Sequence, residues 1–190
     1  MNAAQMAQAL KEKFGNAITS ATEFRGEQSL TVKLESLKPL MRYCRDEMGF
    51  DYLIDVSSVD HSESEPRFEL VYELYGLGHH QHLRVKSQIS EEQEAPTVSD
   101  LWATANWHER EIFDMMGIRF DGHPDLRRIL MWEGYPFHPL RKEFPLAGKI
   151  SDMPEVAFTG IAPLAGGPFV TSPSDADTLE REPRAKSFGE

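Results

Sequence analysis

Acidic and histidine side chains that could perform catalysis or bind a metal gather between Asn106 and Leu146. Hydrolases use paired carboxylates as general acid and base, but Glu109 and Glu111 are two positions apart and project about 200° apart on a helix. Zinc enzymes commonly place two histidines four residues apart on a helix, and that spacing is absent. We therefore expect structural hydrogen bonds from His123 and His138, and assign the chain no catalytic residue.

A second group of histidines lies farther toward the N-terminus. His80 and His82 would project to the same side of a strand, which is one way to hold Zn²⁺ or Cu²⁺. They lack a clear third ligand, and the neighbouring Arg84 and Lys86 would repel a cation. The acidic residues in the loop over 57–66 have no fixed geometry. We therefore expect no metal site, and an exposed polar sheet face instead.

The sequence contains a single cysteine, Cys44. Iron–sulfur clusters usually require about four cysteine ligands, so this chain cannot hold one. A glycine-rich dinucleotide motif following a strand is also missing. We therefore expect no cofactor in this chain. If the protein belongs to an electron-transfer assembly, the electrons travel through other subunits.

The chain is acidic, with a formal net charge of −11 over 190 residues. Nucleic acids and anionic lipid surfaces carry charge of the same sign, so we exclude both as main partners. The N-terminal residues lack the basic start and apolar core of a signal peptide, and no run approaches the ~20 apolar residues of a membrane helix. We therefore expect membrane contact only through other proteins.

Hydrophobic periodicity and turn residues predict the elements that carry these side chains. Helices are expected over 1–14, 36–48 (with Ser36 as its cap) and from 97 or 99 to 116, and strands over 18–24, 30–34, 52–56, 68–77 and 80–89. Short turns between strands favour antiparallel pairing. The predicted class is α+β, a mainly antiparallel sheet with helices packed on one face, followed by an extended C-terminal segment and arm.

We divide the chain into four parts on this basis. They are an α+β domain (1–96), a central helix (97–118), an extended docking segment (119–150) and a C-terminal arm rich in proline and glycine (151–190). The docking segment contains too many prolines and glycines for a regular element, yet is too apolar for a solvated linker. It must therefore lie on its own domain or on another protein. Spaced apolar residues in the arm suit a chain that orders on a partner.

The central helix carries a carboxylate, Glu109, inside its apolar stripe. Such a carboxylate is costly unless it is paired. Glu109, Glu111 and Asp114 also lie in the C-terminal half of the helix, where the helix dipole disfavours anions. Arginines suit these carboxylates because their fork binds bidentately, and the local candidates are Arg110, Arg119, Arg127, Arg128 and Arg141.

Four motifs in this region carry a resemblance. They are Glu109-Arg110-Glu111, Phe113 to Gly117, Gly122 to Leu130, and Trp132-Glu133-Gly134 continuing through His138 to Lys142. Together they resemble the 30-kDa subunit family of NADH–quinone oxidoreductase, respiratory complex I, whose member in that complex is designated by the letter C. The resemblance implies a structural subunit of the peripheral arm, on the cytoplasmic face of the bacterial cell membrane. It implies that FMN and the iron–sulfur clusters are bound by partner subunits.

The same resemblance implies that the chain packs against other peripheral-arm subunits, especially the quinone-site subunit. The complex oxidises NADH with a quinone and couples this reaction to ion translocation. Ion pairs within and between subunits are expected from Glu109, Arg110, Glu111, Asp114, Arg127, Arg128, Arg141 and Lys142. The docking surface is expected to be shaped by His123, Pro124, Trp132, Tyr135, Pro136, His138 and Pro139.

Two alternatives remain open at this stage. Related subunits occur in membrane-bound hydrogenases and in quinone oxidoreductases that take electrons from a donor other than NADH. A free-standing protein-interaction adaptor would share the docking surface without the redox context.

Overall fold

The computed structural model describes residues 3–62, 64–132 and 134–145. Its helices are α1 (Ala3–Phe14), the short 3-10 helix η1 (Gly15–Ala17), α2 (Leu34–Asp46) and α3 (Ala105–Met116). Its strands are β1 (Ile18–Phe24), β2 (Glu27–Val32), β3 (Tyr52–Asp60), β4 (Phe68–Gly76), β5 (Gln81–Ile89), β6 (Glu94–Pro96) and β7 (Arg119–Asp121). The predicted α+β class is confirmed. The predicted arm, 151–190, and residues 133 and 146–150 of the docking segment lie outside the described residues.

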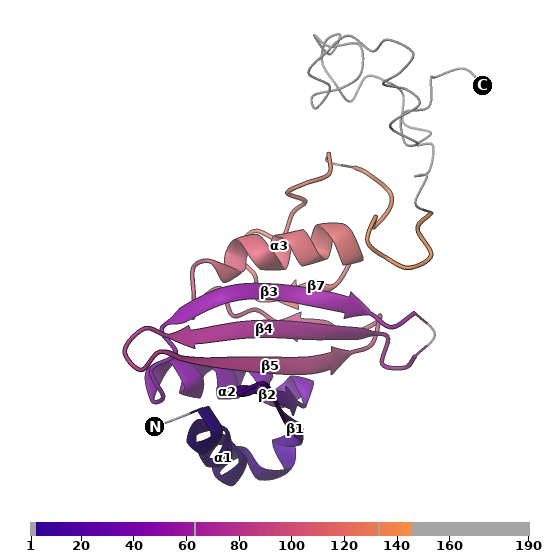
Figure 1. The fold of residues 1–190 in the computed structure, drawn as a ribbon. Helices are drawn as coiled ribbons and strands as arrows, with labels where there is room; N and C mark the ends of the chain where they lie inside the picture. Colours follow the sequence, from indigo (N-terminus) through magenta and orange to yellow (C-terminus); the bar gives the residue numbers. More distant parts are fainter. Residues whose placement is uncertain (1–2, 63, 133, 146–190) are drawn as a thin grey trace, which may run out of the picture.

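Five strands form one sheet in the order β1-β2-β5-β4-β3 (Figure 1). Neighbouring strands are antiparallel except for β2 and β5, which run parallel, with Gln28 opposite Leu83 and Thr31 opposite Lys86. Two further strands, β6 and β7, form a separate parallel pair. Because β7 opens the docking segment, this pair ties the segment to the end of the α+β domain.

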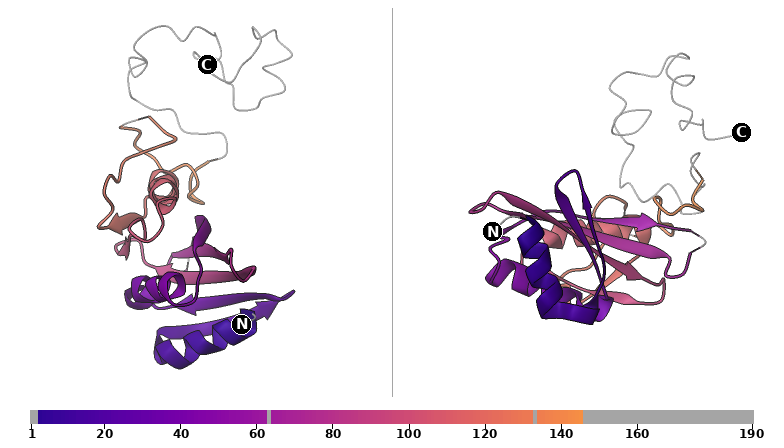
Figure 2. Two further views of the ribbon diagram at one scale, coloured as in Figure 1. Left: turned by 90° about the vertical axis from the view of Figure 1, so that its left-hand side faces the viewer. Right: turned by 60° about the horizontal axis from the view of Figure 1, so that its bottom comes forward.

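One face of the sheet is buried, and the opposite face carries most of the charged side chains of the sheet. On β4, Leu70, Tyr72 and Leu74 are fully buried, since successive residues of a strand alternate between the two faces. Helices α2 and α3 lie over this face, and α1 lies at the β1–β2 end of the sheet (Figure 2). The predicted placement of helices on one face therefore holds for α2 and α3.

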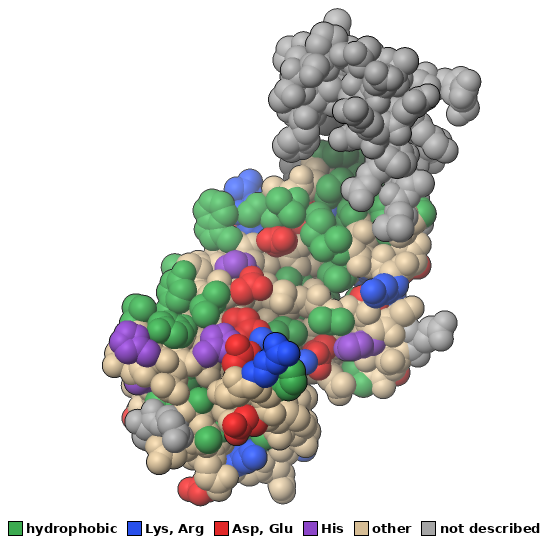
Figure 3. Space-filling view, in the orientation of Figure 1, with side chains coloured by type: hydrophobic (Ala, Val, Ile, Leu, Met, Phe, Trp, Pro, Cys, Tyr) green, Lys and Arg blue, Asp and Glu red, His purple; other side chains and the backbone are tan. Residues whose placement is uncertain are grey.

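The polar face of the sheet gathers charged and histidine side chains (Figure 3). Glu73 pairs with Arg84, and its second oxygen lies 2.9 Å from Nε2 of His82. Lys86 pairs with Glu69 at 2.9 Å on the same face. His80 lies in the turn before β5 with a φ of 55°, so it does not share the strand with His82 as predicted.

A single buried cluster runs from α1 to β7. It includes Leu10 of α1, Leu40 of α2, Leu101, Ala105 of α3 and Phe120 of β7. The central helix is therefore built into the core of the α+β domain, with no break in packing at residue 96. Of the helices that the structure describes, none is long and apolar enough to cross a membrane.

The central helix starts later than predicted. It begins at Ala105, and the expected caps Thr97 and Ser99 lie in the turns before it. The amide N–H groups of Leu101 and Trp102 bond to the carbonyl oxygen of Val98, which closes a turn of its own. The prediction of a helix before Ala105 was therefore wrong. A tight turn there buries the apolar residues, such as Leu101, whose spacing suggested a helix.

Two other boundaries also differ from the prediction. α2 begins at Leu34 with Lys33 at its N-cap, so Ser36 lies inside the first turn and does not cap the helix. β3 continues to Asp60, opposite Phe68 of β4, where a loop was expected from residue 57. Pairing with β4 overrides the polar composition of this stretch.

Gly117 ends α3 in a left-handed conformation, with φ of 80°. A Cβ atom there would lie 2.7 Å from Nε2 of His138 and 2.8 Å from Nη2 of Arg141. We expect Gly117→Ala to lower the free energy of unfolding by about 1–2 kcal/mol, because the alanine is strained and displaces both side chains. Urea denaturation measures this change. Gly78→Ala is the matched control, since no atom lies within 4 Å of its added Cβ; an equal loss in both variants would contradict the prediction.

Candidate functional site

The candidate site is the docking segment, which the structure describes as far as residue 145 with the exception of residue 133. After β7 this described part contains no helix or strand, and it lies beside the C-terminal end of α3 (Figure 1). A segment without regular structure must satisfy its backbone polar groups by other contacts. Two carboxylates, Asp114 and Asp60, together accept hydrogen bonds from four backbone N–H groups of the segment.

Asp114 lies on α3 and is completely buried. Its Oδ2 accepts hydrogen bonds from the backbone N–H groups of Ile129, Leu130 and Met131, at 3.0, 2.7 and 2.8 Å. Its Oδ1 accepts a bond from Nη1 of Arg128 at 2.5 Å. Burial by itself raises the pKa of Asp114, but these donors outweigh it and hold the pKa below its usual value. The carboxylate thus fixes three consecutive amides of the docking segment.

The docking segment also satisfies the last carbonyl groups of α3, which have no partner inside the helix. Nδ1 of His138 donates to the carbonyl oxygen of Asp114 at 3.0 Å, and the N–H of Leu140 donates to that of Met115 at 3.1 Å. Nε of Arg141 donates to the carbonyl oxygen of Met116 at 2.7 Å. These donors meet the negative end of the helix dipole, where cations are favoured.

The surroundings of His138 disfavour its charged form. Burial lowers its pKa, as do the nearby charges of Arg141 and Arg128, although the bond to Asp114 acts in the opposite direction. The predicted structural hydrogen bonding of His138 is what the structure shows. His123 also forms structural hydrogen bonds: its Nε2 donates to the carbonyl oxygen of Asn106 at 3.1 Å, and its Nδ1 accepts from the N–H of Asp125 at 3.0 Å.

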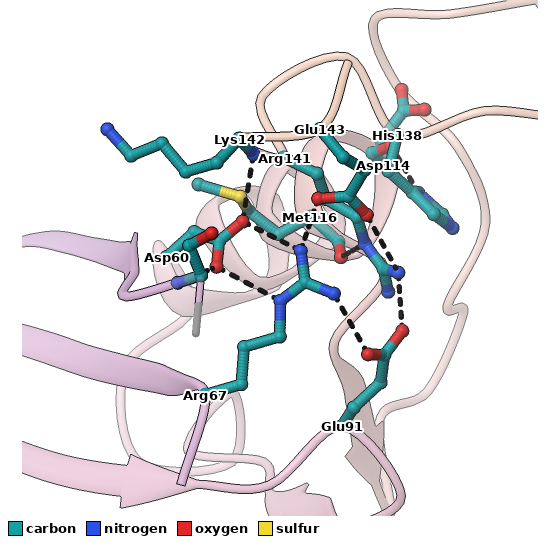
Figure 4. A network of polar contacts seen from close by, with 10 residues as sticks. Asp60, Arg67, Glu91, Asp114, Met116, His138, Arg141, Lys142 and Glu143 are labelled. Atoms are coloured by element: carbon teal, nitrogen blue, oxygen red, sulfur yellow. Dashed lines mark hydrogen bonds and ion pairs between the residues drawn. The ribbon is translucent and has the colours of Figure 1, made fainter. Parts of the chain in front are cut away.

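Asp60 organises a second group of contacts at the end of β3 (Figure 4). The guanidinium of Arg67 binds it through two bonds, of 3.0 and 2.9 Å, and the backbone N–H of Lys142 donates to it at 2.9 Å. Arg67 also pairs with Glu91 at 2.9 Å and with Glu143. The bonds from Arg67 are the largest cause that holds the pKa of Asp60 well below its usual range.

Arg141 joins the two groups of contacts. Its Nε binds the end of α3, and its Nη1 lies 2.5 Å from an oxygen of Glu91, which also binds Arg67 (Figure 4). Glu91 comes from the loop after β5, so its two arginine partners connect the sheet to the docking segment. Sequence reasoning did not select Asp60, Arg67 or Glu91, because only the β3–β4 hairpin brings Asp60 and Arg67 together.

The other charged residues predicted to form ion pairs differ in their partners and exposure. Arg110 donates to the backbone carbonyl oxygens of Arg127 and Arg128, at 3.1 and 3.0 Å, and therefore anchors the segment through backbone acceptors. Arg127 pairs with Asp125 on the exposed surface at 2.9 Å. Glu111 is exposed on α3. Of the residues expected to form ion pairs, Asp114, Arg127, Arg128 and Arg141 do so within the chain.

Glu109 is completely buried and does not receive the predicted arginine partner. Its Oε2 accepts a bond from the hydroxyl of Thr97 at 2.5 Å, and its Oε1 accepts one from the N–H of Val98 at 2.8 Å. Among the described residues no arginine forms an ion pair with this carboxylate, and Nε2 of His123 lies 3.9 Å away. Burial raises the pKa of Glu109 to about 7, although the bonds from Thr97 and Val98 oppose the shift.

The aromatic residues of the docking segment pack in sequence. Trp132 and Tyr135 meet edge to face with ring centres 5.6 Å apart, as do Tyr135 and Phe137. Phe137 in turn lies 6.0 Å from Phe144. Of the predicted prolines, Pro124 and Pro136 are exposed and Pro139 is half-buried. The side chain of Lys142 is exposed, while its backbone N–H binds Asp60.

Large apolar side chains remain exposed on the docking segment. Leu130 is 61% exposed and Leu140 is 57% exposed. Both lie next to residues whose backbone or side chain is anchored to α3. Trp107 on α3, 67% exposed, was missed by sequence reasoning because it lies off the apolar stripe. In the described part of the chain, no three His, Cys, Asp or Glu residues are placed to hold a metal ion. The arrangement is suited to binding another protein.

Several known proteins are similar to most of the chain. The C 2 subunit of NADH-quinone oxidoreductase from Rhizobium meliloti is 46% identical over 137 residues, which cover 71% of this chain and 75% of the relative. The corresponding NADH-quinone oxidoreductase subunit from Geotalea uraniireducens is 44% identical over 140 residues, or 73% of this chain and 85% of the relative.

A solved structure shares the fold. It is a chain of the membrane-bound sulfane sulfur reductase, an archaeal respiratory membrane complex, with a TM-score of 0.65 and 21% identity over 75% of this chain and 85% of that chain. The family model described as the 30-kDa subunit of respiratory-chain NADH dehydrogenase matches residues 30–150, which include α3 and the docking segment. This chain therefore belongs to the 30-kDa subunit family of respiratory-chain NADH dehydrogenase.

Proposed function

We propose that this chain is a structural subunit of the peripheral arm of NADH–quinone oxidoreductase that holds no cofactor itself. In that role it supports electron transfer from NADH to quinone coupled to ion translocation. The names of its relatives support this assignment. The observation that carries the structural part is the docking segment, which buried charges fix to the domain while Leu130 and Leu140 remain exposed.

We further propose that the docking segment contacts the quinone-site subunit, on the cytoplasmic face of the cell membrane. FMN and the iron–sulfur clusters then belong to partner subunits. Asp114, Arg128 and Arg141 shape the surface from inside the chain, whereas the exposed Pro124 and Lys142 are available to a neighbour. This division follows from burial, because a side chain already paired inside the chain has little left to offer a partner.

An affinity pull-down of the tagged full chain from solubilised membranes, followed by mass spectrometry, tests the assignment. We expect the quinone-site subunit and the subunits that carry iron–sulfur clusters and FMN to co-purify. Recovery with a hydrogenase or another electron-donor subunit in place of the NADH-oxidising one would identify a related complex. Recovery of the chain alone would contradict a structural role in any such assembly.

The exposed leucines give a sharper test of the docking surface. We expect Leu140→Glu or Leu130→Glu to reduce co-purification of the quinone-site subunit at least tenfold, because a carboxylate would be desolvated in an apolar contact. Leu77→Glu is the matched control, since Leu77 is also 57% exposed but lies in the turn between β4 and β5. Equal recovery of the partner with all three variants would contradict the placement of the interface.

A further inference from the structure

Glu109 differs from the other buried carboxylates because, among the described residues, no lysine or arginine forms an ion pair with it. Asp60 and Asp114 each bind an arginine, whereas Glu109 receives one hydroxyl and one backbone N–H. Its side chain and that of His123 are both fully buried. Nε2 of His123 already donates to the carbonyl oxygen of Asn106. In such a site, a carboxyl group without a cationic partner is more stable as the protonated acid than as the carboxylate.

The groups that face Glu109 come from four parts of the chain. Tyr72 of β4 has a buried hydroxyl that forms no hydrogen bond to any of the described residues, and its pKa is raised first by burial and then by the charge of Glu109. Lys38 of α2 and Asp100 act on Glu109 in opposite directions, and they pair with each other at 3.0 Å. Together with His123, these groups leave Glu109 without a net positive neighbour.

A chain of two hydroxyl groups leads from Glu109 toward the surface. The hydroxyl of Thr97 lies 2.5 Å from Oε2 of Glu109 and 2.8 Å from the hydroxyl of Ser99, and either of these two hydroxyls can be the donor. Thr97 is buried, whereas Ser99 is partly exposed. The two hydroxyl groups can therefore donate toward Glu109 when it is a carboxylate, or donate away from it when it is a carboxylic acid.

We propose that Glu109 is a buried proton-binding site that exchanges its proton with solvent through the hydroxyl groups of Thr97 and Ser99. On release, the acid gives its Oε2 proton to the oxygen of Thr97, Thr97 gives its hydroxyl proton to Ser99, and Ser99 gives its own to water. A carboxylate remains, and it accepts the bond from Thr97. Uptake reverses each transfer. The release of one proton therefore leaves one negative charge on Glu109, and uptake removes it.

Because Glu109 and its two donors connect α3 to the turn after β6, the site lies where the docking segment begins. The β6–β7 pair, and the bond from the N–H of Thr97 to the carbonyl oxygen of Asp121, attach that turn to β7. The inference concerns the isolated chain and does not depend on the proposed function. If the pull-down recovers no partner, the proton-site proposal is unaffected. If Glu109 titrates near its ordinary pKa, the proposed docking surface is unaffected.

Carbon-13 NMR of the full chain, labelled at the glutamate side-chain carboxyl carbons, tests the proton site directly. We expect one carboxyl signal to titrate near pH 7 and to disappear in Glu109→Gln. Glu111→Gln is the matched control, since Glu111 is exposed on the same helix, and it should leave that signal in place. If all glutamate signals titrate near their ordinary pKa, the proposal is overturned.

Thr97→Val tests the hydroxyl chain. It removes a donor to the carboxylate, so we expect the titration midpoint of Glu109 to rise in this variant. Ser99→Ala, whose hydroxyl does not bind Glu109, should move the midpoint less. An unchanged midpoint in Thr97→Val would overturn the proposal, because it would show that the hydroxyl of Thr97 does not bind the carboxyl group of Glu109.

Urea denaturation of the wild type and Glu109→Gln gives an independent measurement. The raised pKa stabilises the fold fully below the unfolded-state value of 4.5, and this contribution is lost as the pH rises to about 7. Relative to the variant, the unfolding equilibrium constant of the wild type should therefore increase by about tenfold for each pH unit between about 5 and 7. A ratio that does not change with pH would contradict a protonated Glu109.

Discussion

Asp114→Ala is expected to lower the free energy of unfolding by about 3–5 kcal/mol and to release the docking segment from α3. The change leaves the guanidinium of Arg128 without its carboxylate, in a site where its side chain is only 16% exposed. It also removes the acceptor for three consecutive backbone N–H groups, at Ile129, Leu130 and Met131. Urea denaturation gives the energy, and limited trypsin digestion with mass spectrometry locates the released bonds.

Asp125→Ala provides the control for this experiment. Asp125 is also an aspartate paired with an arginine of the docking segment, but its side chain is 55% exposed and that of Arg127 is 71% exposed. Exposed pairs contribute little, so we expect a change within about 0.5 kcal/mol. If Asp114→Ala and Asp125→Ala have equal effects, or if cleavage in the docking segment does not increase in Asp114→Ala, the anchoring role of Asp114 is wrong.

Asp60→Ala is expected to lower the free energy of unfolding by about 2–4 kcal/mol. Its side chain is fully buried and binds both Arg67 and the backbone N–H of Lys142, so the loss affects the β3–β4 hairpin and the docking segment together. The expected loss is below that for Asp114, because Arg67 keeps Glu91 and Glu143 as partners. Glu94→Ala, which removes an exposed pair with Arg119, should have little effect.

The contribution of Asp60 should also depend on pH with a defined sign. Its folded-state pKa is lowered, so its contribution is complete above the unfolded value of 3.8 and is lost as the pH falls below it. The difference in unfolding free energy between wild type and Asp60→Ala should therefore be constant from about pH 5 to 8 and shrink below about pH 4. A difference that grows on acidification would contradict the pairing with Arg67.

Local patterns in the sequence were sufficient for much of the fold. Alternating apolar residues identified β4 and β5, and the glycine at 117 marked the end of α3, because side-chain periodicity and left-handed backbone conformations are properties of short stretches. The same local density of charge and proline around Asp114 and His138 identified the docking segment. The resemblance of the protein to the 30-kDa subunit family was also carried by local sequence motifs between Glu109 and Lys142.

Tertiary structure alone decided which groups meet. The parallel pairing of β2 with β5, and the bonds between Asp60, Arg67 and Glu91, join residues that no local pattern relates. The sequence predicted an arginine for Glu109 because its helical position implied burial. Its actual donors, Thr97 and Val98, come from a turn that the apolar spacing had assigned to the helix. Burial is encoded by periodicity, but a partner depends on which distant segment packs against the buried group, and that is a property of the whole fold.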